Sequence, residues 1–276
     1  MNPNKIIEQI NSSDKLLFKL FKEPLNQELL EKLNKISVET HLIAITPRSG
    51  SSYFIDLLRK TNKMGEPGEY LNSNLVPDII NNLQVNNFYD FWVSLIKRKS
   101  CETGFGVKAS FFQFEPLIET GLDELLFKNR KIILLQRKNI IKQAISLYLA
   151  TQSNIFHTNI EHSKDKWAVL ETIEYSNKDI QNWVKHIYNQ ELGWKKYLTN
   201  KSYLSLWYED ILNSPQDCVI NTLSFLNLKP NEEDVNIKSI FKKLRNAKNQ
   251  EFYEIFLSKK SNIDYLHKLT ILDNRF

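Results

Sequence analysis

Four short apolar runs, separated by segments of helical periodicity, constrain the fold of this chain more than any other feature. The runs are Leu42–Ile45, Phe105–Val107, Ile132–Leu135 and Tyr203–Trp207, and all are rich in residues that favour strands. Strands that are apolar throughout and alternate with helices are typical of a parallel sheet with both faces covered. The sequence therefore predicts an α/β fold in which helices flank a mostly parallel central sheet.

Two of the expected helices are especially clear. After the third run, apolar residues recur at helical spacing from Ile140 to Leu149, and Asn139 stands where a helix cap is favoured. A longer helix is expected from about Glu174 to Leu198, and its predicted buried side consists of Ile180, Trp183, Val184, Ile187, Trp194 and Leu198. Residues 3–38 indicate two or three short amphipathic helices. We therefore expect an N-terminal helical extension over residues 1–40 and a main domain over residues 41–276.

The composition excludes several classes of protein. With 276 residues and 42% hydrophobic content, the chain can bury one sizeable core. No apolar run approaches the roughly 20 residues that span a bilayer, and the N-terminus lacks a signal-peptide pattern, so we expect a cytoplasmic protein without a membrane span. The net charge of +5 is dispersed. No basic stripe alternates with aromatic residues, so no nucleic-acid partner is expected.

The cysteines and histidines give no sign of a disulfide or of a metal site. Cys101 and Cys218 lie far apart in the sequence. The histidines lack the spacing of metal ligands; they are His41, His157, His162, His186 and His267. We therefore expect a function that needs no metal ion.

The segment TPRSGSSYF, residues 46–54, has the features of an anion-binding loop. It follows the first strand, and ligands of open parallel sheets bind beyond the carboxyl ends of the strands. Gly50 allows close approach of the backbone, and the helix that follows offers free N–H groups and a positive dipole. The fork of Arg48 suits phosphate or sulfate oxygens, and further donors are available from Ser49, Ser51 and Ser52. A purely structural turn is the alternative that these residues leave open.

The same loop argues against an ordinary nucleoside triphosphatase. A Walker A loop would read GxxxxGK[ST], and no such motif is present. A second basic position follows the third strand, where Arg137 precedes a helix that carries Ser146 about two turns further on. This pair can hold a second phosphate, although Arg137 taken alone is also compatible with plain surface charge.

Several segments together resemble one known family. They are PRSGSSYFIDLLRKTNKMGEPGEY, RKNIIKQAISLYLATQ, LGWKKYL and YED. From His41 to Leu228, and loosely near Arg245, the chain is similar to the bacterial trehalose 2-sulfotransferase-like family. The resemblance implies the P-loop-related sulfotransferase fold and the sulfuryl donor 3′-phosphoadenosine 5′-phosphosulfate (PAPS). Members of this family are commonly homodimers, so a homodimer is expected.

The resemblance also implies roles for individual residues. The loop around the donor's 5′-phosphosulfate would consist of Arg48, Ser49, Gly50, Ser51 and Ser52. Arg137 and Ser146 match the residues that hold the 3′-phosphate. Tyr208 opens the YED segment, where sulfotransferases place residues near the adenine, although an aromatic residue at a strand end is often there for packing.

The segment MGEPGEY supplies the candidate base. Glu69 matches the family's catalytic glutamate. Glu66 matches the carboxylate three residues before it and is expected to bind the acceptor substrate; an N-terminal cap or a loop partner is the alternative for Glu66. A carboxylate suits this chemistry because the acceptor hydroxyl must lose its proton during transfer. Lys108 matches a family lysine that can contact the acceptor or the sulfate; ordinary surface charge is its alternative.

The sequence therefore predicts a PAPS-dependent sulfotransferase that acts on a hydroxyl of a carbohydrate or glycoconjugate. A lipid, a peptide or a small alcohol is the alternative acceptor. A non-catalytic nucleotide-binding protein is the alternative from another class. Leu149 stands where the family usually has arginine, and the region between Glu69 and Phe105 matches poorly.

Overall fold

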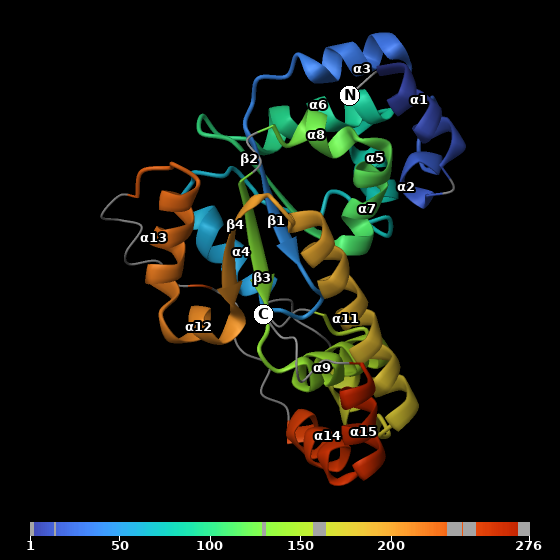
Figure 1. Cartoon of the computed structure of the whole chain (residues 1–276), viewed down its shortest axis with the longest axis vertical. Coiled ribbons are helices and arrows are strands. Elements are labelled where there is room, and N and C mark those ends of the chain that lie inside the picture. Colours follow the sequence, from blue (N-terminus) through green and yellow to red (C-terminus); the bar gives the residue numbers. More distant parts are fainter. Residues whose placement is uncertain are drawn as a thin grey trace.

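The computed structural model describes residues 3–13, 15–128, 131–156, 164–230, 239 and 247–269. Its centre is a four-stranded sheet in the order β2-β1-β3-β4, in which all neighbouring strands are parallel (Figure 1). The strands are β1 (Thr40–Ile45), β2 (Phe105–Ser110), β3 (Lys131–Gln136) and β4 (Ser202–Trp207). The four predicted strands are confirmed, and each is slightly longer than its apolar run.

Alternate residues of the strands point to opposite faces of the sheet, and helices cover both faces. Leu42 and Ala44 pack on one face with α6 (Phe88–Lys99), α7 (Phe111–Thr120) and α8 (Leu122–Leu126). Ile43 and Ile45 pack on the other face with α4 (Ser51–Lys60) and α13 (Pro215–Phe225). Burial on both sides explains the apolar runs of β1, β2 and β3, whereas in β4, at the edge of the sheet, Leu206 is the one buried residue. The predicted α/β fold is confirmed.

Three short helices precede the sheet, as the sequence indicates. They are α1 (Pro3–Ser12), α2 (Leu16–Lys19) and α3 (Gln27–Asn34). Ile6, Leu17 and Leu33 are buried in the same apolar cluster as Leu42 of β1. Full burial of an aliphatic side chain contributes about 1.5–3 kcal/mol, so these helices stabilise the main core. The division into residues 1–40 and 41–276 stays a prediction.

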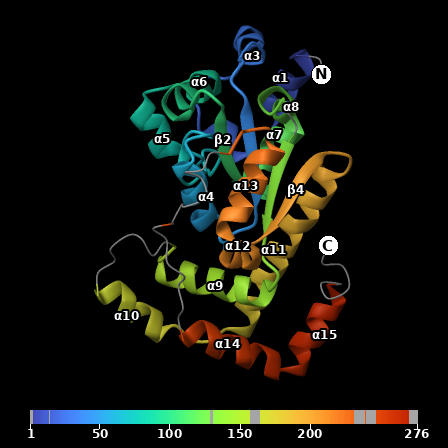
Figure 2. The same cartoon turned by 90° about the vertical axis from the view of Figure 1, so that its left-hand side faces the viewer.

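A helical lobe extends beyond the carboxyl ends of the strands (Figures 1 and 2). It consists of α9 (Ile140–Ser153), α10 (Lys164–Thr172), α11 (Asn177–Leu198), α14 (Ala247–Ser258) and α15 (Lys260–Lys268), which share a third apolar cluster. The α9 cap is confirmed, since the Asn139 side chain accepts a hydrogen bond of 2.8 Å from Lys142 N. Helix α11 connects the lobe to the sheet, because Trp194 Nε1 donates to the carbonyl of Ile45 at 2.8 Å.

The burial of Trp183 differs from the sequence-based expectation. Trp183 of α11, predicted to be buried, is only half-buried, because its ring lies against His186 at the margin of the lobe.

The remaining helices are α5 (Val76–Leu83) and α12 (Tyr208–Asn213). In the described part of the chain, every helix is too short or too polar to span a bilayer.

Candidate active site

The candidate site lies at the carboxyl edge of the sheet, where all four strands end. Because the strands are parallel, the segments that follow β1, β2, β3 and β4 meet at this edge. A further segment joins them: Gly68 forms a parallel bridge with Val107 and so places Glu69 beside β2. The predicted site residues on these segments therefore lie at the same edge.

The loop between β1 and α4 is bent so that backbone N–H groups remain available. Gly50 has φ 81° and precedes the first residue of α4, and Arg48 has φ 64°. No side chain caps α4, and its first turn contains no acidic residue. The first N–H groups of a helix lack partners within the helix, and together with the helix dipole they favour an anion. The geometry of this loop is therefore suited to phosphate or sulfate.

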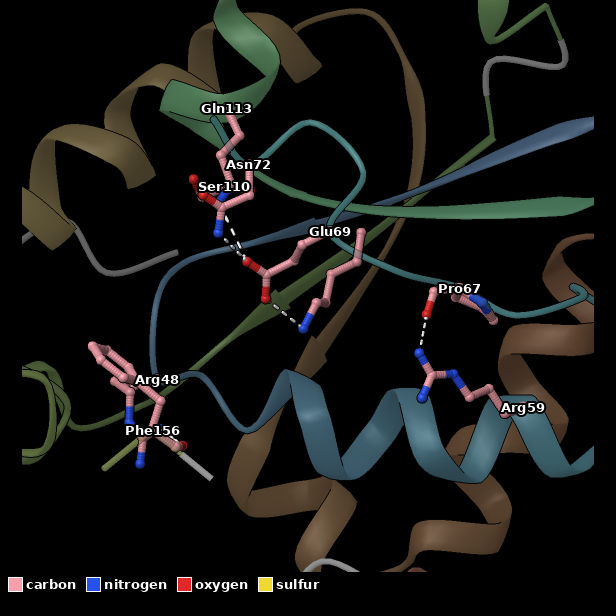
Figure 3. Close-up of polar contacts among 9 residues, drawn as sticks. Arg48, Arg59, Pro67, Glu69, Asn72, Ser110, Gln113 and Phe156 are labelled. Atoms are coloured by element: carbon pink, nitrogen blue, oxygen red, sulfur yellow. Dashed lines mark hydrogen bonds and ion pairs between the residues drawn. The ribbon is translucent and has the colours of Figure 1, made fainter. Parts of the chain in front are cut away.

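The side chain of Arg48 links this loop to α9 and to the residues that follow it. Its Nε donates to Ser146 Oγ at 3.1 Å. Its Nη1 donates to the carbonyl of Phe156 at 2.5 Å (Figure 3). Burial lowers the pKa of Arg48 to about 10, with the nearby charge of Arg137 acting in the same direction. The guanidinium nevertheless stays charged at neutral pH. Arg48 and Ser146, assigned to different ends of the donor, are thus in direct contact.

Beneath the loop, the structure adds a residue that the sequence analysis did not single out. Gln143 of α9 is fully buried, and its Nε2 donates to Thr46 Oγ1 at 2.8 Å and to the carbonyl of Pro47 at 2.7 Å. Gln143 lies four residues after the Asn139 cap, on the side of α9 that faces β1. The sequence did contain a signal for Gln143, because it is a polar residue among the apolar positions of this helix.

The three serines of the loop differ in exposure. Ser49 is fully buried, and its hydroxyl has no partner among the described residues. Ser51 is also buried, whereas Ser52 is partly exposed. The buried hydroxyl of Ser49, the uncapped start of α4 and the charge of Arg48 together fit an anionic group of the donor.

The YED segment, Tyr208 to Asp210, fixes the turn after β3. The Arg137 guanidinium carbon lies 5.1 Å from the centroid of the Tyr208 ring, and its Nη1 donates to the carbonyl of Arg48 at 3.5 Å. Burial raises the pKa of the Tyr208 hydroxyl, and Arg137 partly opposes this shift. Glu209 accepts from Lys138 N at 2.9 Å, and Asp210 lies 2.5 Å from Lys138 Nζ. Tyr208, Arg137 and Arg48 therefore form one continuous group.

Glu69 is the centre of a second polar cluster. Its Oε1 lies 2.7 Å from Lys108 Nζ, and its Oε2 accepts from Asn72 Nδ2 at 3.0 Å and from Gln113 Nε2 at 3.3 Å (Figure 3). The Lys108 side chain is 8% exposed and that of Glu69 is 25% exposed, so the carboxylate has some access to solvent whereas its lysine partner has little. Lys108 is therefore a buried partner of the candidate base.

The electrostatics of the cluster keep Glu69 ionised. Burial alone would raise the pKa of the Glu69 carboxyl, but the charge of Lys108 and the hydrogen bonds from Lys108, Asn72 and Gln113 outweigh it. The pKa therefore lies below its ordinary value. A carboxylate that is ionised at neutral pH can accept a proton from a hydroxyl group.

Backbone contacts fix the position of the Glu69 segment. Lys108 N donates to the carbonyl of Gly68 at 2.9 Å, and Arg59 Nη2 donates to the carbonyl of Pro67 at 2.8 Å. In Figure 3 the Glu69 and Arg48 side chains lie toward the end at which α4 begins, whereas Arg59 lies toward its other end. The candidate base and the anion loop therefore share one end of α4.

Glu66 is not part of the Glu69 cluster. Its carboxylate forms an ion pair with Lys99, at the last residue of α6, and its side chain is 58% exposed. Its role toward an acceptor stays a prediction.

Asn72 and Gln113 were not identified from the sequence. For Gln113 a signal existed, since Ser110 and Gln113 have the spacing of a capping box and Gln113 Oε1 accepts from Ser110 N at 3.0 Å. This bond turns the Gln113 amide nitrogen toward Glu69. Asn72 gave no comparable sequence signal.

Within the residues that the structure describes, no group of three or more His, Cys, Asp or Glu side chains has the arrangement of a metal site. His157, His162 and Arg245 lie outside the described residues. The expectation that no metal is needed stays a prediction.

Three solved structures of sulfotransferases were compared with this chain. The sulfotransferase domain from the curacin biosynthetic pathway superposes with a TM-score of 0.51 at 12% identity, covering 84% of this chain and 98% of that domain. The sulfotransferase domain of the Synechococcus PCC 7002 olefin synthase gives 0.48 at 15% identity, covering 88% and 98%. Mouse sulfotransferase SULT7A1 complexed with PAP gives 0.42 at 15% identity, covering 88% and 93%. The likeness of fold rests on the first of these.

The sheet, its flanking helices and this likeness define the P-loop-related sulfotransferase fold, and the protein is a sulfotransferase enzyme. A family model described as Stf0 sulphotransferase matches residues 120–258, just over half of the chain. The chain belongs to the Stf0 sulphotransferase family. The match includes Arg137, Ser146 and Tyr208, whereas the Arg48 loop and Glu69 precede it. No curated protein sequence matches the chain.

Proposed function

We propose that this enzyme transfers the sulfuryl group of PAPS to a hydroxyl group of a carbohydrate or glycoconjugate. The observation that carries the proposal is that two groups lie at one edge of the sheet. One is the ionised carboxylate of Glu69. The other is the start of α4, which no side chain caps, together with Arg48 in the loop before it. Such a pair meets the two needs of the reaction: a base for the acceptor and cationic or N–H groups for the anionic donor.

The binding roles are distributed over two groups of residues. The 5′-phosphosulfate side of the donor is assigned to Arg48, Ser49, Gly50, Ser51 and Ser52. Arg137 and Ser146 are assigned to the 3′-phosphate and Tyr208 to the adenine. The contact between Arg48 and Ser146 supports a continuous site, because it joins the loop after β1 to α9. One ligand can therefore reach both the residues assigned to the 5′-phosphosulfate and those assigned to the 3′-phosphate.

The chemical step follows from the state of Glu69. PAPS, when bound, supplies the sulfuryl group. Glu69 accepts the proton of the acceptor hydroxyl while the oxygen of that hydroxyl bonds to sulfur. At the same time the bond from sulfur to the 5′-phosphate oxygen breaks, and this oxygen leaves with the nucleotide. Arg48 and the N–H groups at the start of α4 stabilise the negative charge that gathers on the departing phosphate. Lys108 keeps Glu69 ionised before the transfer and adds positive charge next to it.

A homodimer and a cytoplasmic location belong to the same proposal. Both come from the resemblance and the composition given above. Light scattering of the purified enzyme checks the first, since a homodimer would have twice the mass of 32.6 kDa calculated for one chain. Fractionation of the source cells checks the second.

The proposal is tested with adenosine 3′,5′-bisphosphate (PAP), the product nucleotide, and with PAPS carrying labelled sulfate. PAP should raise the melting temperature of the enzyme, and labelled sulfate should appear on sugars or glycoconjugates separated by mass spectrometry. Arg48→Ala should abolish the transfer. An enzyme that PAP does not stabilise, and that transfers no label, would overturn the proposal.

A further inference from the structure

Two exposed phenylalanines lie on segments that contribute to the candidate site. Among the described residues, the phenylalanines with large exposure are Phe112 and Phe156, at 43% and 38%. The other described phenylalanines are buried or half-buried. Exposed aromatic surface next to a reactive group often marks a binding site for a ligand.

Both residues belong to segments that contact the catalytic groups. Phe112 lies in the first turn of α7, one position before Gln113, whose amide donates to Glu69 Oε2 at 3.3 Å. Phe156 follows α9, and its backbone carbonyl accepts from Arg48 Nη1 at 2.5 Å. Phe112 thus adjoins a residue that contacts the base, and Phe156 contacts the anion loop through its backbone.

The ring of Phe112 is supported from one side. Its centroid lies 5.3 Å from that of His186 on α11, with the planes at 63°, and 6.1 Å from that of Phe111, at 66°. His186 in turn packs edge-on against Trp183 at 5.2 Å. Edge-to-face contacts of this kind hold an aromatic ring without covering both of its faces. Phe112 is therefore fixed in place and still open to a ligand.

We infer that Phe112 and Phe156 form the acceptor-binding platform, on which the apolar C–H face of a pyranose ring packs while one of its hydroxyls reaches Glu69. The inference rests on the proposed function and specifies its acceptor. A sugar ring presents C–H groups on its faces and hydroxyls around its edge. It therefore needs an aromatic surface together with polar side chains, and the amides of Asn72 and Gln113 lie at the carboxylate.

The two aromatic side chains can be removed without touching the donor site. The contact of Phe156 with Arg48 uses the backbone carbonyl, so Phe156→Ala keeps it. Tyr203 provides a matched control, because it is 44% exposed but lies near the start of β4, at the opposite edge of the sheet.

The experiment uses saturation-transfer NMR of the full chain with PAP bound and a panel of methyl pyranosides and disaccharides including trehalose. Aryl and alkyl alcohols form a second panel. We expect signals from sugar C–H protons that disappear in Phe112→Ala and weaken in Phe156→Ala. They should persist in Phe112→Trp and in Tyr203→Ala. For a sugar that the enzyme sulfates, Phe112→Ala should raise KM about ten-fold and leave kcat nearly unchanged.

The outcomes separate this inference from the proposed function. If PAP binds every variant equally and Phe112→Ala leaves sugar binding and KM unchanged, the platform is wrong and the sulfotransferase proposal stands. If PAP binds and only the aryl or alkyl alcohols give signals, the pyranose assignment is overturned in favour of an apolar acceptor. If PAP does not bind the wild-type enzyme, both proposals fail.

Discussion

The ring of Tyr208 lies directly against the α-carbon of Gly50. A methyl group added at Gly50 would come within 2.1 Å of Tyr208 Cδ2, far closer than two carbon atoms can approach. The guanidinium of Arg137 lies near the same ring, at 5.1 Å from its centroid. One aromatic side chain thus joins the ends of β1, β3 and β4, which makes the shape of the anion loop dependent on Tyr208.

Gly50→Ala should therefore weaken PAP binding strongly and also lower the stability. The added methyl group meets the Tyr208 ring, and a φ of 81° costs a residue with a side chain about 1–2 kcal/mol. Calorimetry with PAP and thermal unfolding measure the two effects. Gly121→Ala is the control, because Gly121 has a similar φ of 78° at the far end of α7. That variant should lose stability and keep its PAP affinity; equal loss of affinity in both would refute the explanation.

Glu69→Gln should reduce kcat by roughly 100-fold or more while leaving PAP affinity unchanged, because an amide cannot accept the proton. Single-turnover transfer from labelled PAPS measures the chemical step, and calorimetry measures binding. Glu28→Gln serves as the control, since Glu28 forms an exposed ion pair with Lys32 on α3, away from the candidate site. A Glu69→Gln enzyme of nearly normal kcat would remove Glu69 from the role of base.

Lys108→Met should move the acidic limb of the pH–rate profile to higher pH. In the proposed mechanism activity requires ionised Glu69, so the rate should fall as the pH drops through the pKa of its carboxyl. In the wild type Lys108 helps to hold this pKa below its ordinary value of about 4.3. Without Lys108 the burial of Glu69 remains and raises the pKa. The profile of kcat/KM between pH 3.5 and 8 should show the limb shifted upward; an unshifted limb would contradict the electrostatic role of Lys108.

The same linkage affects stability. Because the pKa of Glu69 is lower in the folded than in the unfolded protein, its ionised form stabilises the fold above pH 4.3, about its unfolded pKa. This stabilisation is lost as the pH falls through the folded-state pKa. Lys108→Met should therefore flatten the acid side of a stability–pH curve measured by urea unfolding.

Arg137→Ala should weaken PAP binding about ten-fold or more, because the variant loses a charged donor assigned to the 3′-phosphate. The Kd from calorimetry is the measurement. Arg98→Ala, on the exposed side of α6, is the matched control and should bind PAP normally. An unchanged Kd in Arg137→Ala would remove Arg137 from the donor site.

Much of the fold could be predicted because local patterns determine it. Continuous apolar runs predicted the four strands, and the Asn139 cap predicted the start of α9, which the hydrogen bond to Lys142 N confirms. Burial on both faces of the sheet explains why the strand signal was strong for β1, β2 and β3. The half-exposure of Trp183 was missed because helical periodicity gives the direction of a side chain but not the edge of a lobe.

The contacts within the site could be predicted less well. Arg48 and Ser146 lie 98 residues apart and Arg48 and Phe156 lie 108 apart, so their contacts depend on how α9 crosses the carboxyl edge. No local pattern contains that information. The ion pair of Lys108 with Glu69 is of the same kind, because it depends on the register of the Gly68 bridge against β2.

The contact of Arg48 with the Phe156 carbonyl has a consequence for which molecules the loop admits. A neutral ligand arriving there would merely exchange one uncharged acceptor for another and gain little. The bond of the charged Arg48 to the carbonyl is already charge-assisted, and a phosphate or sulfate oxygen adds the attraction of a full negative charge. In the proposed donor site, displacement of the Phe156 carbonyl from Arg48 would therefore favour an anionic ligand over an uncharged one.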